Sequence, residues 1–222
     1  MKYLEDEVLI ISRINYGESD RILTAIGPKL GKIKIMAKGI RKPTSKLAGN
    51  VELLSYSKLN LVQSREGGMV RLTGAKVIEH YPQILKDIDT TMMVYDWLKV
   101  VDKLSLDGEG QEYFDLLRTS LNALNEQKID PKNVHIWLYI QLINTGGYTL
   151  NWDNIEDLTD GTLDFDFDSH QFVPSAVGRY DQAVAKLIKF YGEAENPKQV
   201  VCGESLQTAS GKLLSEIIKR IV

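Results

Sequence analysis

Cysteine is almost absent from this chain, because Cys202 is the only one among 222 residues. A single cysteine excludes an internal disulfide and any zinc site built from cysteines. Long apolar runs are missing as well, since no stretch approaches the roughly 20 residues needed to span a bilayer. The first seven residues carry acids where a secretion signal has basic residues followed by an apolar segment. We therefore expect a cytoplasmic protein without membrane contact.

The motifs of nucleotide binding and catalysis are also missing. There is no GxxxxGK[ST] phosphate loop and no GxGxxG after a strand pattern. His80, His135 and His170 lie far apart in the sequence, without an HExxH motif or a neighbouring nucleophile. We therefore expect no catalytic residue, no metal site, no cofactor and no small-molecule substrate.

The formal net charge of −3 conceals an uneven distribution along the chain. Residues 1–80 contain 14 Lys and Arg against 8 Asp and Glu, whereas residues 81–222 contain 13 against 22. Such asymmetry between two parts of a chain is typical of two domains, one of which faces a polyanion.

The amino-terminal part has the pattern of strands. Short apolar or alternating runs occur at 8–11, 21–26, 32–38, 59–62 and 69–72, and glycine-containing turn signals separate them. Arg65-Glu66-Gly67-Gly68 between the last two runs predicts a hairpin turn. About five strands without an intervening long helix predict a small antiparallel β-barrel over residues 1–80.

After Tyr81-Pro82 the apolar period changes from two to about 3.6 residues, which predicts helices over most of residues 81–222. Asp130-Pro131 has the composition of a helix start, and Gly146-Gly147 can end that helix. Residues 163–173 interrupt the helices with the pattern of a β-hairpin. The fold class is therefore α+β, with a barrel at 1–80 and a helical domain at 81–222 that carries a small hairpin.

One segment of the barrel is strongly basic. Between residues 29 and 46 there is no acid, and seven basic side chains occur at Lys29, Lys32, Lys34, Lys38, Arg41, Lys42 and Lys46. On the alternating strand, Lys32, Lys34 and Lys38 share one face, while the residues between them, Ile33, Ile35 and Ala37, share the other. The charge continues into a polar loop at 41–46.

A row of cations that leads into a basic loop is suited to follow a phosphodiester backbone. Neutralising about five phosphates gives a slope of roughly −3.5 in a plot of log affinity against log salt for a single strand. The alternative is a solvated face that discourages aggregation at a sheet edge, although such faces usually mix both charge signs. We interpret Lys32, Lys34, Lys38, Arg41, Lys42 and Lys46 as a nucleic-acid-binding site without sequence specificity, since aromatic partners are few in residues 1–80: Tyr3, Tyr16 and Tyr56.

Three short motifs resemble the amino-terminal domain of the RecO family of recombination mediators. They are Tyr16-Gly17-Glu18-Ser19-Asp20-Arg21-Ile22-Leu23, then Gly31-Lys32, then Ala37-Lys38-Gly39-Ile40-Arg41-Lys42 with Gly49 shortly after. The resemblance covers residues 8–80 and continues more loosely to Gly147-Tyr148.

The resemblance implies an OB-fold followed by a helical domain. It also implies a non-enzymatic role in DNA repair and recombination in the RecF pathway. That role comprises binding of single- and double-stranded DNA, annealing of complementary strands, and work with RecR to load recombinase onto DNA coated by single-strand-binding protein. Many members of the family place four zinc-binding cysteines after the central helix, but residues 151–175 contain none here. We therefore expect packing of Phe165, Phe167 and Phe172 to hold the hairpin without zinc.

Two other functions remain open at the level of sequence. Asp164, Asp166 and Asp168 alternate with phenylalanines and would share one strand face, as the carboxylates of a metal-dependent nuclease or phosphodiesterase do. A second alternative is a protein-interaction scaffold whose basic face meets an acidic partner. In the acidic helical part, Tyr95, Trp97, Trp137 and Tyr139 either fill the helical core or line a groove for a peptide of single-strand-binding protein.

Overall fold

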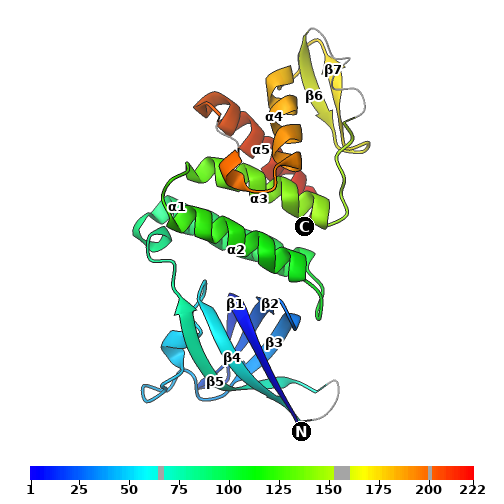
Figure 1. Cartoon of the computed structure of the whole chain (residues 1–222). Coiled ribbons are helices and arrows are strands. Elements are labelled where there is room, and N and C mark those ends of the chain that lie inside the picture. The colour runs from blue at the N-terminus through cyan, green and yellow to red at the C-terminus, as the bar shows by residue number, and fades with distance from the viewer. Residues whose placement is uncertain (65–67, 153–160, 200–201) are drawn as a thin grey trace. The chain divides into compact units, whose positions relative to one another are not determined.

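The computed structural model describes residues 1–64, 68–152, 161–199 and 202–222. Its contacts divide the chain into two compact units, Met1–Arg118 and Thr119–Val222 (Figure 1). The first unit contains β1 (Lys2–Tyr16), β2 (Asp20–Gly27), β3 (Gly31–Ala37), η1 (Ala48–Asn50), β4 (Tyr56–Gln63), β5 (Val70–Glu79), η2 (Ile84–Lys86) and α1 (Ile88–Leu104). The boundary between the units, after Arg118, lies within helix α2 (Gln111–Asn125).

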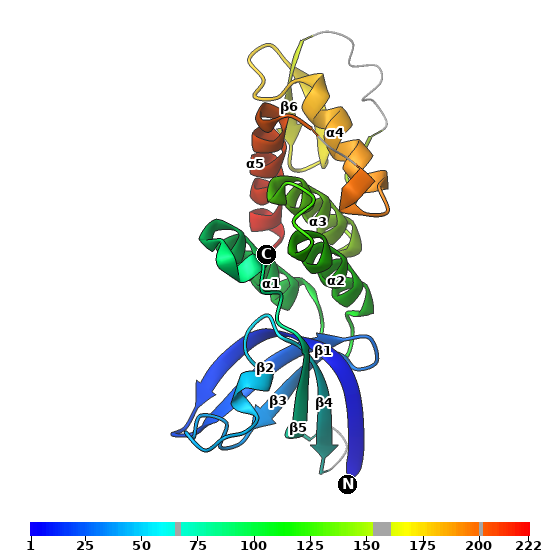
Figure 2. The ribbon, with the colours of Figure 1, turned by 60° about the vertical axis from the view of Figure 1, so that its left-hand side comes forward.

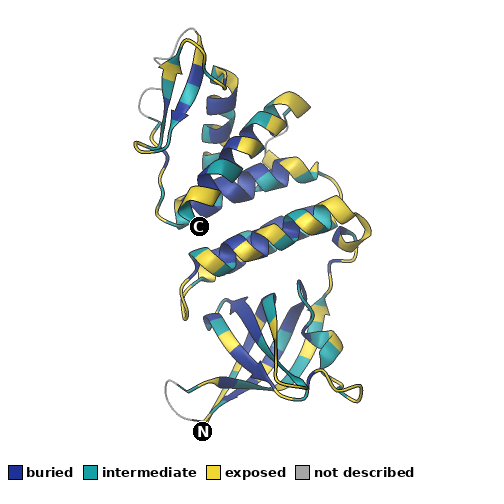
Figure 3. Cartoon of the chain, turned by 180° about the vertical axis from the view of Figure 1, so that it is seen from behind, coloured by how far each residue is buried: buried dark blue, intermediate teal, exposed yellow. Residues whose placement is uncertain are grey.

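The five strands of the first unit form a closed barrel in the order β1-β2-β3-β5-β4. All neighbours are antiparallel except β3 and β5, whose short parallel pairing closes the barrel. The interior is filled by aliphatic side chains, among them Val8, Leu23, Ile35 and Leu59, so buried residues recur along the strands (Figure 3). The predicted five-stranded OB-type fold is therefore confirmed, although residues 65–67 of the predicted turn at 65–68 lie outside the described residues.

Strand β1 contains a bulge that changes which side chains face the interior. Ile10 pairs with Ala25, but the next pair joins Ser12 to Thr24, so the strand has one additional residue between Ile10 and Ser12. Side chains alternate between the two faces of a strand, and a one-residue insertion therefore exchanges the faces beyond it. Beyond the bulge, Arg13 pairs with the core residue Leu23 and shares its face, whereas Ile14 pairs with Ile22 on the outward face.

The first unit extends beyond the barrel to include α1 and the segment that follows it. The turn between β2 and β3 lies against residues 105–110, because the Lys32 amide donates to the Glu109 carbonyl at 2.6 Å and the Gly108 amide donates to the Lys32 carbonyl at 2.8 Å. Gly31 has a φ of +61°, and a Cβ there would come within 2.6 Å of the Glu109 carbonyl oxygen. Only glycine tolerates both conditions.

The second unit contains α3 (Pro131–Thr145), β6 (Thr162–Asp166), β7 (Gln171–Ser175), α4 (Gln182–Glu193), η3 (Pro197–Gln199) and α5 (Glu204–Ile221). Helix α3 is its centre: it contacts both α4 and α5 and buries residues on every side, as a helix surrounded by others must. The Asp130 side chain caps α3 by accepting from the Lys132 amide at 2.8 Å, as the sequence predicts. No described helix combines the length and apolar character required to cross a bilayer.

The hairpin β6–β7 pairs Phe165 with Phe172 across its two strands. Both rings are buried and meet edge to face at 5.3 Å, and Phe167 contacts Phe165 in the same way at 5.1 Å. Tyr180, just after the hairpin, adds a further ring against Phe172 at 6.1 Å. The predicted cluster of three phenylalanines is therefore confirmed.

Candidate nucleic-acid interface

Strand β3 presents the predicted alternation of apolar and basic side chains. Ile35 and Ala37 belong to the buried barrel core, and Ile33 packs against that core. Lys34 on the opposite face is exposed, and so is Lys38, which directly follows the strand. Lys34 and Lys38 are therefore about 13 Å apart along the outward face of β3, because two residues advance a strand by about 6.6 Å.

Lys32 does not belong to this exposed row, and in this respect the prediction is wrong. Its side chain is among the buried charged groups, at 8% exposure. Its Nζ atom lies 3.0 Å from the Asp102 carboxylate and 3.1 Å from the Ser105 carbonyl, and it also donates to the Asp102 carbonyl. These groups belong to the last turn of α1 and the residue after it, where carbonyls lack helical partners and the helix dipole favours a cation. Lys32 therefore stabilises the end of a helix.

The basic loop, residues 38–46, begins with two anchors. Ile40 is buried in the barrel core, and the Gly39 amide donates to the Asp20 carboxylate at 2.7 Å. The Arg41 amide donates to the Ser19 carbonyl at 2.9 Å, and its guanidinium donates to the Gly17 carbonyl at 3.3 Å. The loop therefore lies beside the turn that joins β1 to β2 (Figure 2).

Within this loop the cationic groups point into solvent. Lys38, Arg41, Lys42 and Lys46 are all exposed, and no carboxylate in the described part of the chain forms an ion pair with any of them. The adjacent turn contributes Glu18 and Asp20, of which Asp20 is occupied by the Gly39 amide. The structure therefore brings four of the six predicted residues together in an accessible group.

Lys34 is exposed like the cations of the basic loop, but like Lys32 it has a carboxylate partner. Its Nζ atom lies 3.4 Å from the Asp107 carboxylate, and both side chains are more than half exposed. An exposed pair at this distance is weak, since water screens the charges and both side chains lose freedom by pairing. Lys34 therefore remains accessible to an anionic ligand.

Two arginines of the same unit are engaged elsewhere. Arg13 and Arg21 both contact the Glu52 carboxylate, Arg21 at 3.3 Å. Burial and the neighbouring Arg21 charge lower the pKa of Arg13 from its ordinary value. This cluster ties the β1–β2 ribbon to the segment after η1, so its charge is largely neutralised within the fold.

Two apolar residues are exposed beside the basic loop: Ile14, which the sequence pattern did not single out, and Tyr16, one of the three aromatic residues in residues 1–80. Ile14 and Tyr16 are 60% and 54% exposed near the end of β1. Alternation counted from the buried Ile10 would place both inside the barrel, whereas the bulge turns them outward. The polar residues Arg13 and Asn15 would by alternation favour the same wrong assignment, so the strand register was needed to show that Ile14 and Tyr16 face outward.

The acidic row proposed for metal chemistry is not assembled. The Asp164 carboxylate lies 3.1 Å from the Arg179 guanidinium, and Asp166 accepts from the Asp168 amide and the Ser169 hydroxyl. These hydrogen bonds lower the pKa of Asp166, with the Ser169 contact the largest cause. Asp168 lies in the turn after β6, so the expectation of one shared strand face is wrong for it. Within the described ranges, no three His, Cys, Asp or Glu side chains are grouped as metal ligands.

Three of the four helical aromatics named from the sequence are core residues in their own units, whereas Tyr95 is only half-buried. Trp97 is fully buried in the first unit. In the second unit Trp137 and Tyr139 are buried, and the Trp137 indole donates to the Ala194 carbonyl at 2.8 Å. The groove hypothesis for these rings is therefore not supported.

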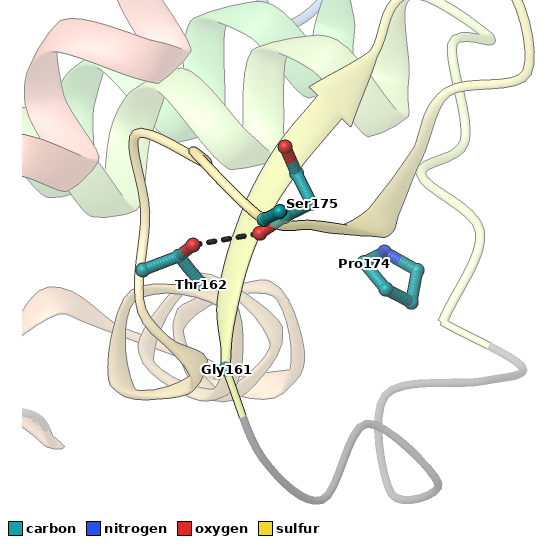
Figure 4. A pocket seen from close by; sticks show the side chains of 5 residues that line it. Gly161, Thr162, Pro174 and Ser175 are labelled. Atoms are coloured by element: carbon teal, nitrogen blue, oxygen red, sulfur yellow. Dashed lines mark hydrogen bonds between the residues drawn. The ribbon is translucent and has the colours of Figure 1, made fainter.

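A shallow hollow in the second unit lies along the edge of the hairpin. It is lined by Gly161, Thr162, Pro174, Ser175 and Ala176, and Thr162 donates to the Ser175 carbonyl at 2.7 Å across it (Figure 4). None of these side chains is charged or titratable, so the hollow offers no group for acid–base or metal chemistry.

Comparison with known proteins matches two family models to the chain. The model described as Recombination protein O N terminal matches residues 1–81, and the model described as Recombination protein O C terminal matches residues 85–194. The described barrel therefore coincides with the first match, and α1 to α4 fall within the second.

Individual relatives bear the name DNA repair protein RecO. The protein from Acetivibrio thermocellus is 30% identical over 149 residues, covering 67% of this chain and 59% of the relative. The protein from Desulfitobacterium hafniense is 32% identical over 147 residues, covering 66% and 52%. The protein from Heliobacterium modesticaldum is 31% identical over 125 residues, covering 56% and 45%. The chain thus spans about half the length of the curated relatives that it matches.

Proposed function

The chain belongs to the RecO family, and from this premise we propose that it is a non-enzymatic DNA repair and recombination mediator that holds DNA through its barrel. The observation that carries the proposal is the basic loop. Four exposed cations, Lys38, Arg41, Lys42 and Lys46, lie together on a loop that Ile40 and Gly39 anchor to the barrel. In OB-folds the face of strands 2 and 3 and the loop between strands 1 and 2 contribute to oligonucleotide binding, and the basic loop lies beside that β1–β2 turn.

The electrostatics favour the phosphate backbone as the ligand. Ammonium and guanidinium groups in solvent release condensed counterions when they neutralise phosphates, which gives affinity without sequence readout. Lys34 lies on the outward face of β3 and can extend the contact from the loop along the strand. The interface that we propose therefore consists of Lys34, Lys38, Arg41, Lys42 and Lys46. Lys32 is not part of it, because its side chain is buried against the end of α1.

We include in the proposal the finer activities that the resemblance to the RecO family implies. They are binding of both single- and double-stranded DNA, annealing of complementary strands, and work with RecR and single-strand-binding protein during recombinase loading. Contact with the phosphate backbone suits annealing, because it leaves the base edges free to pair.

The test is a variant in which Lys38, Arg41 and Lys42 are all changed to alanine, measured by fluorescence anisotropy with labelled single-stranded DNA over a salt series. We expect weaker binding and a log–log salt slope that is shallower by about 2, since each lost phosphate contact on a single strand contributes about 0.7. The matched control replaces Lys29, Lys76 and Lys86, three exposed lysines elsewhere in the same unit, and should bind nearly as the unaltered protein does.

Normal binding by the loop variant at moderate salt would contradict the proposed interface. Incubation of the labelled strand with Mg²⁺ or Mn²⁺ separates a mediator from a nuclease, because a mediator leaves the strand intact. Annealing of a complementary strand, followed in the same samples, tests the finer activity.

A further inference from the structure

The outward face of β1, β2 and β3 forms a grid that the strand register defines. Ser12, Thr24 and Lys34 lie side by side, and so do Ile14, Ile22 and Met36 in the next row. The last row begins with Tyr16 beside Asp20, and Lys38 follows β3 at the same level. Apolar side chains thus occupy a row between two lysines.

The open part of this grid is its end near the basic loop. Thr24, Lys32 and Met36 are buried, whereas Ile14 and Tyr16 are more than half exposed and Ile22 is partly exposed. We name Ile14, Tyr16 and Ile22 the rim patch. Exposed aliphatic and aromatic groups cost hydration free energy, and a bulge that turns them away from the core is a feature found where side chains are re-aimed for binding.

The surroundings of the rim patch specify the chemistry of its occupant. Arg41 binds the Gly17 carbonyl at 3.3 Å, one residue after Tyr16, and Lys34 and Lys38 flank Met36 on the neighbouring strand. An apolar and aromatic surface bordered by cations is complementary to a ligand with flat apolar faces on an anionic chain. Unpaired nucleobases on a single strand have this character, since every base has a π-face and every linkage carries a negative charge.

We propose that the rim patch is a platform on which one or two unpaired bases of single-stranded DNA stack, with Tyr16 as the stacking ring. The inference rests on the proposed function, because it assigns the base contact to the same interface whose cations hold the backbone. A duplex keeps its bases stacked inside and cannot use this surface. The rim patch therefore gives the protein a preference for single strands that the cations alone do not provide.

The experiment measures anisotropy of the full chain with three labelled ligands: an oligothymidine, an abasic strand of equal length, and a duplex. Tyr16→Ala should weaken binding to the oligothymidine about tenfold, which corresponds to the known range for loss of one stacked base. Binding to the abasic strand and the duplex should stay unchanged. Tyr16→Phe should restore the affinity for oligothymidine, because it retains the ring.

The matched control is Tyr3→Ala, since Tyr3 is a tyrosine of the same strand that is 78% exposed far from the basic loop. It should bind all three ligands as the unaltered protein does. The platform proposal is wrong if Tyr16→Ala binds oligothymidine as tightly as the unaltered protein does. It is also wrong if Tyr16→Ala loses as much affinity for the abasic strand as for oligothymidine. If the loop variant loses binding while Tyr16→Ala does not, only the platform fails; if the protein binds none of the ligands, the proposed function fails with it.

Discussion

Lys32 shows how the role of a single cation depends on what surrounds it. In the sequence it is one of seven basic residues without an intervening acid, yet in the fold it is the only one of the six predicted contact residues that is buried. A buried ammonium needs several acceptors, because removal from water penalises its charge. Asp102 and the carbonyls of Asp102 and Ser105 supply them.

Replacement of Lys32 by methionine should therefore reduce stability and leave DNA binding intact. We expect the free energy of unfolding to fall by about 2 kcal/mol, because carbonyls at the end of α1 lose their donor and Asp102 loses its counter-charge. Urea denaturation measures this change. Lys34→Met, with its exposed side chain, is the control and should shift the free energy by no more than about 0.5 kcal/mol. If the Lys32→Met protein folds but binds DNA much more weakly, this prediction is wrong and Lys32 contributes to the DNA interface.

At the scale of elements, the β6–β7 hairpin shows how aromatic packing joins two short strands. The hairpin has no cysteine at all in its sequence, and its strands are joined instead through Phe165 and Phe172. Arg220 lies over the Phe167 ring at 3.7 Å, so α5 also contributes to holding the turn. Aromatic pairs in edge-to-face contact add to the free energy gained by burial.

Phe172→Ala should destabilise the second unit, since the ring contacts both Phe165 and Tyr180. We expect a loss of about 3 kcal/mol, the usual cost of removing a buried phenylalanine ring, together with faster hydrogen exchange in residues 162–175. Val173→Ala, on the less buried face of the same strand, serves as the control. A thermal transition that responds to zinc or to a chelator would contradict the packing account.

The whole molecule divides into two compact units at a place that periodicity alone does not indicate. The change of apolar period lies near residue 80, while the contacts place α1 and the first part of α2 with the barrel, up to Arg118. Phe114 and Arg118 both reach Tyr56 of β4, the guanidinium at 3.7 Å from the ring centroid. The barrel therefore depends on residues after position 80 for part of its cover.

This dependence predicts the behaviour of truncated chains. A fragment of residues 1–125, which ends with α2, should fold and unfold cooperatively. A fragment of residues 1–80 lacks the partners of Lys32, Gly31 and Tyr56, so its melting temperature should be lower by roughly 10 °C or more. Circular dichroism with heating compares the two. Equal melting temperatures would instead support an independent domain at 1–80, as the sequence pattern proposes.

The sequence by itself determined the strands, the helices and the place of the basic loop, because these depend on local periodicity and on charges that lie close together along the chain. It also indicated the family through short motifs around Tyr16–Leu23 and Ala37–Lys42. Only the tertiary structure decided which cations remain free: α1 buries Lys32, while Lys38 and Arg41 stay in solvent. It likewise decided that Ile14 and Tyr16 face outward, since one additional residue in β1 reverses the faces of the strand and no local pattern reveals where pairing between distant residues slips.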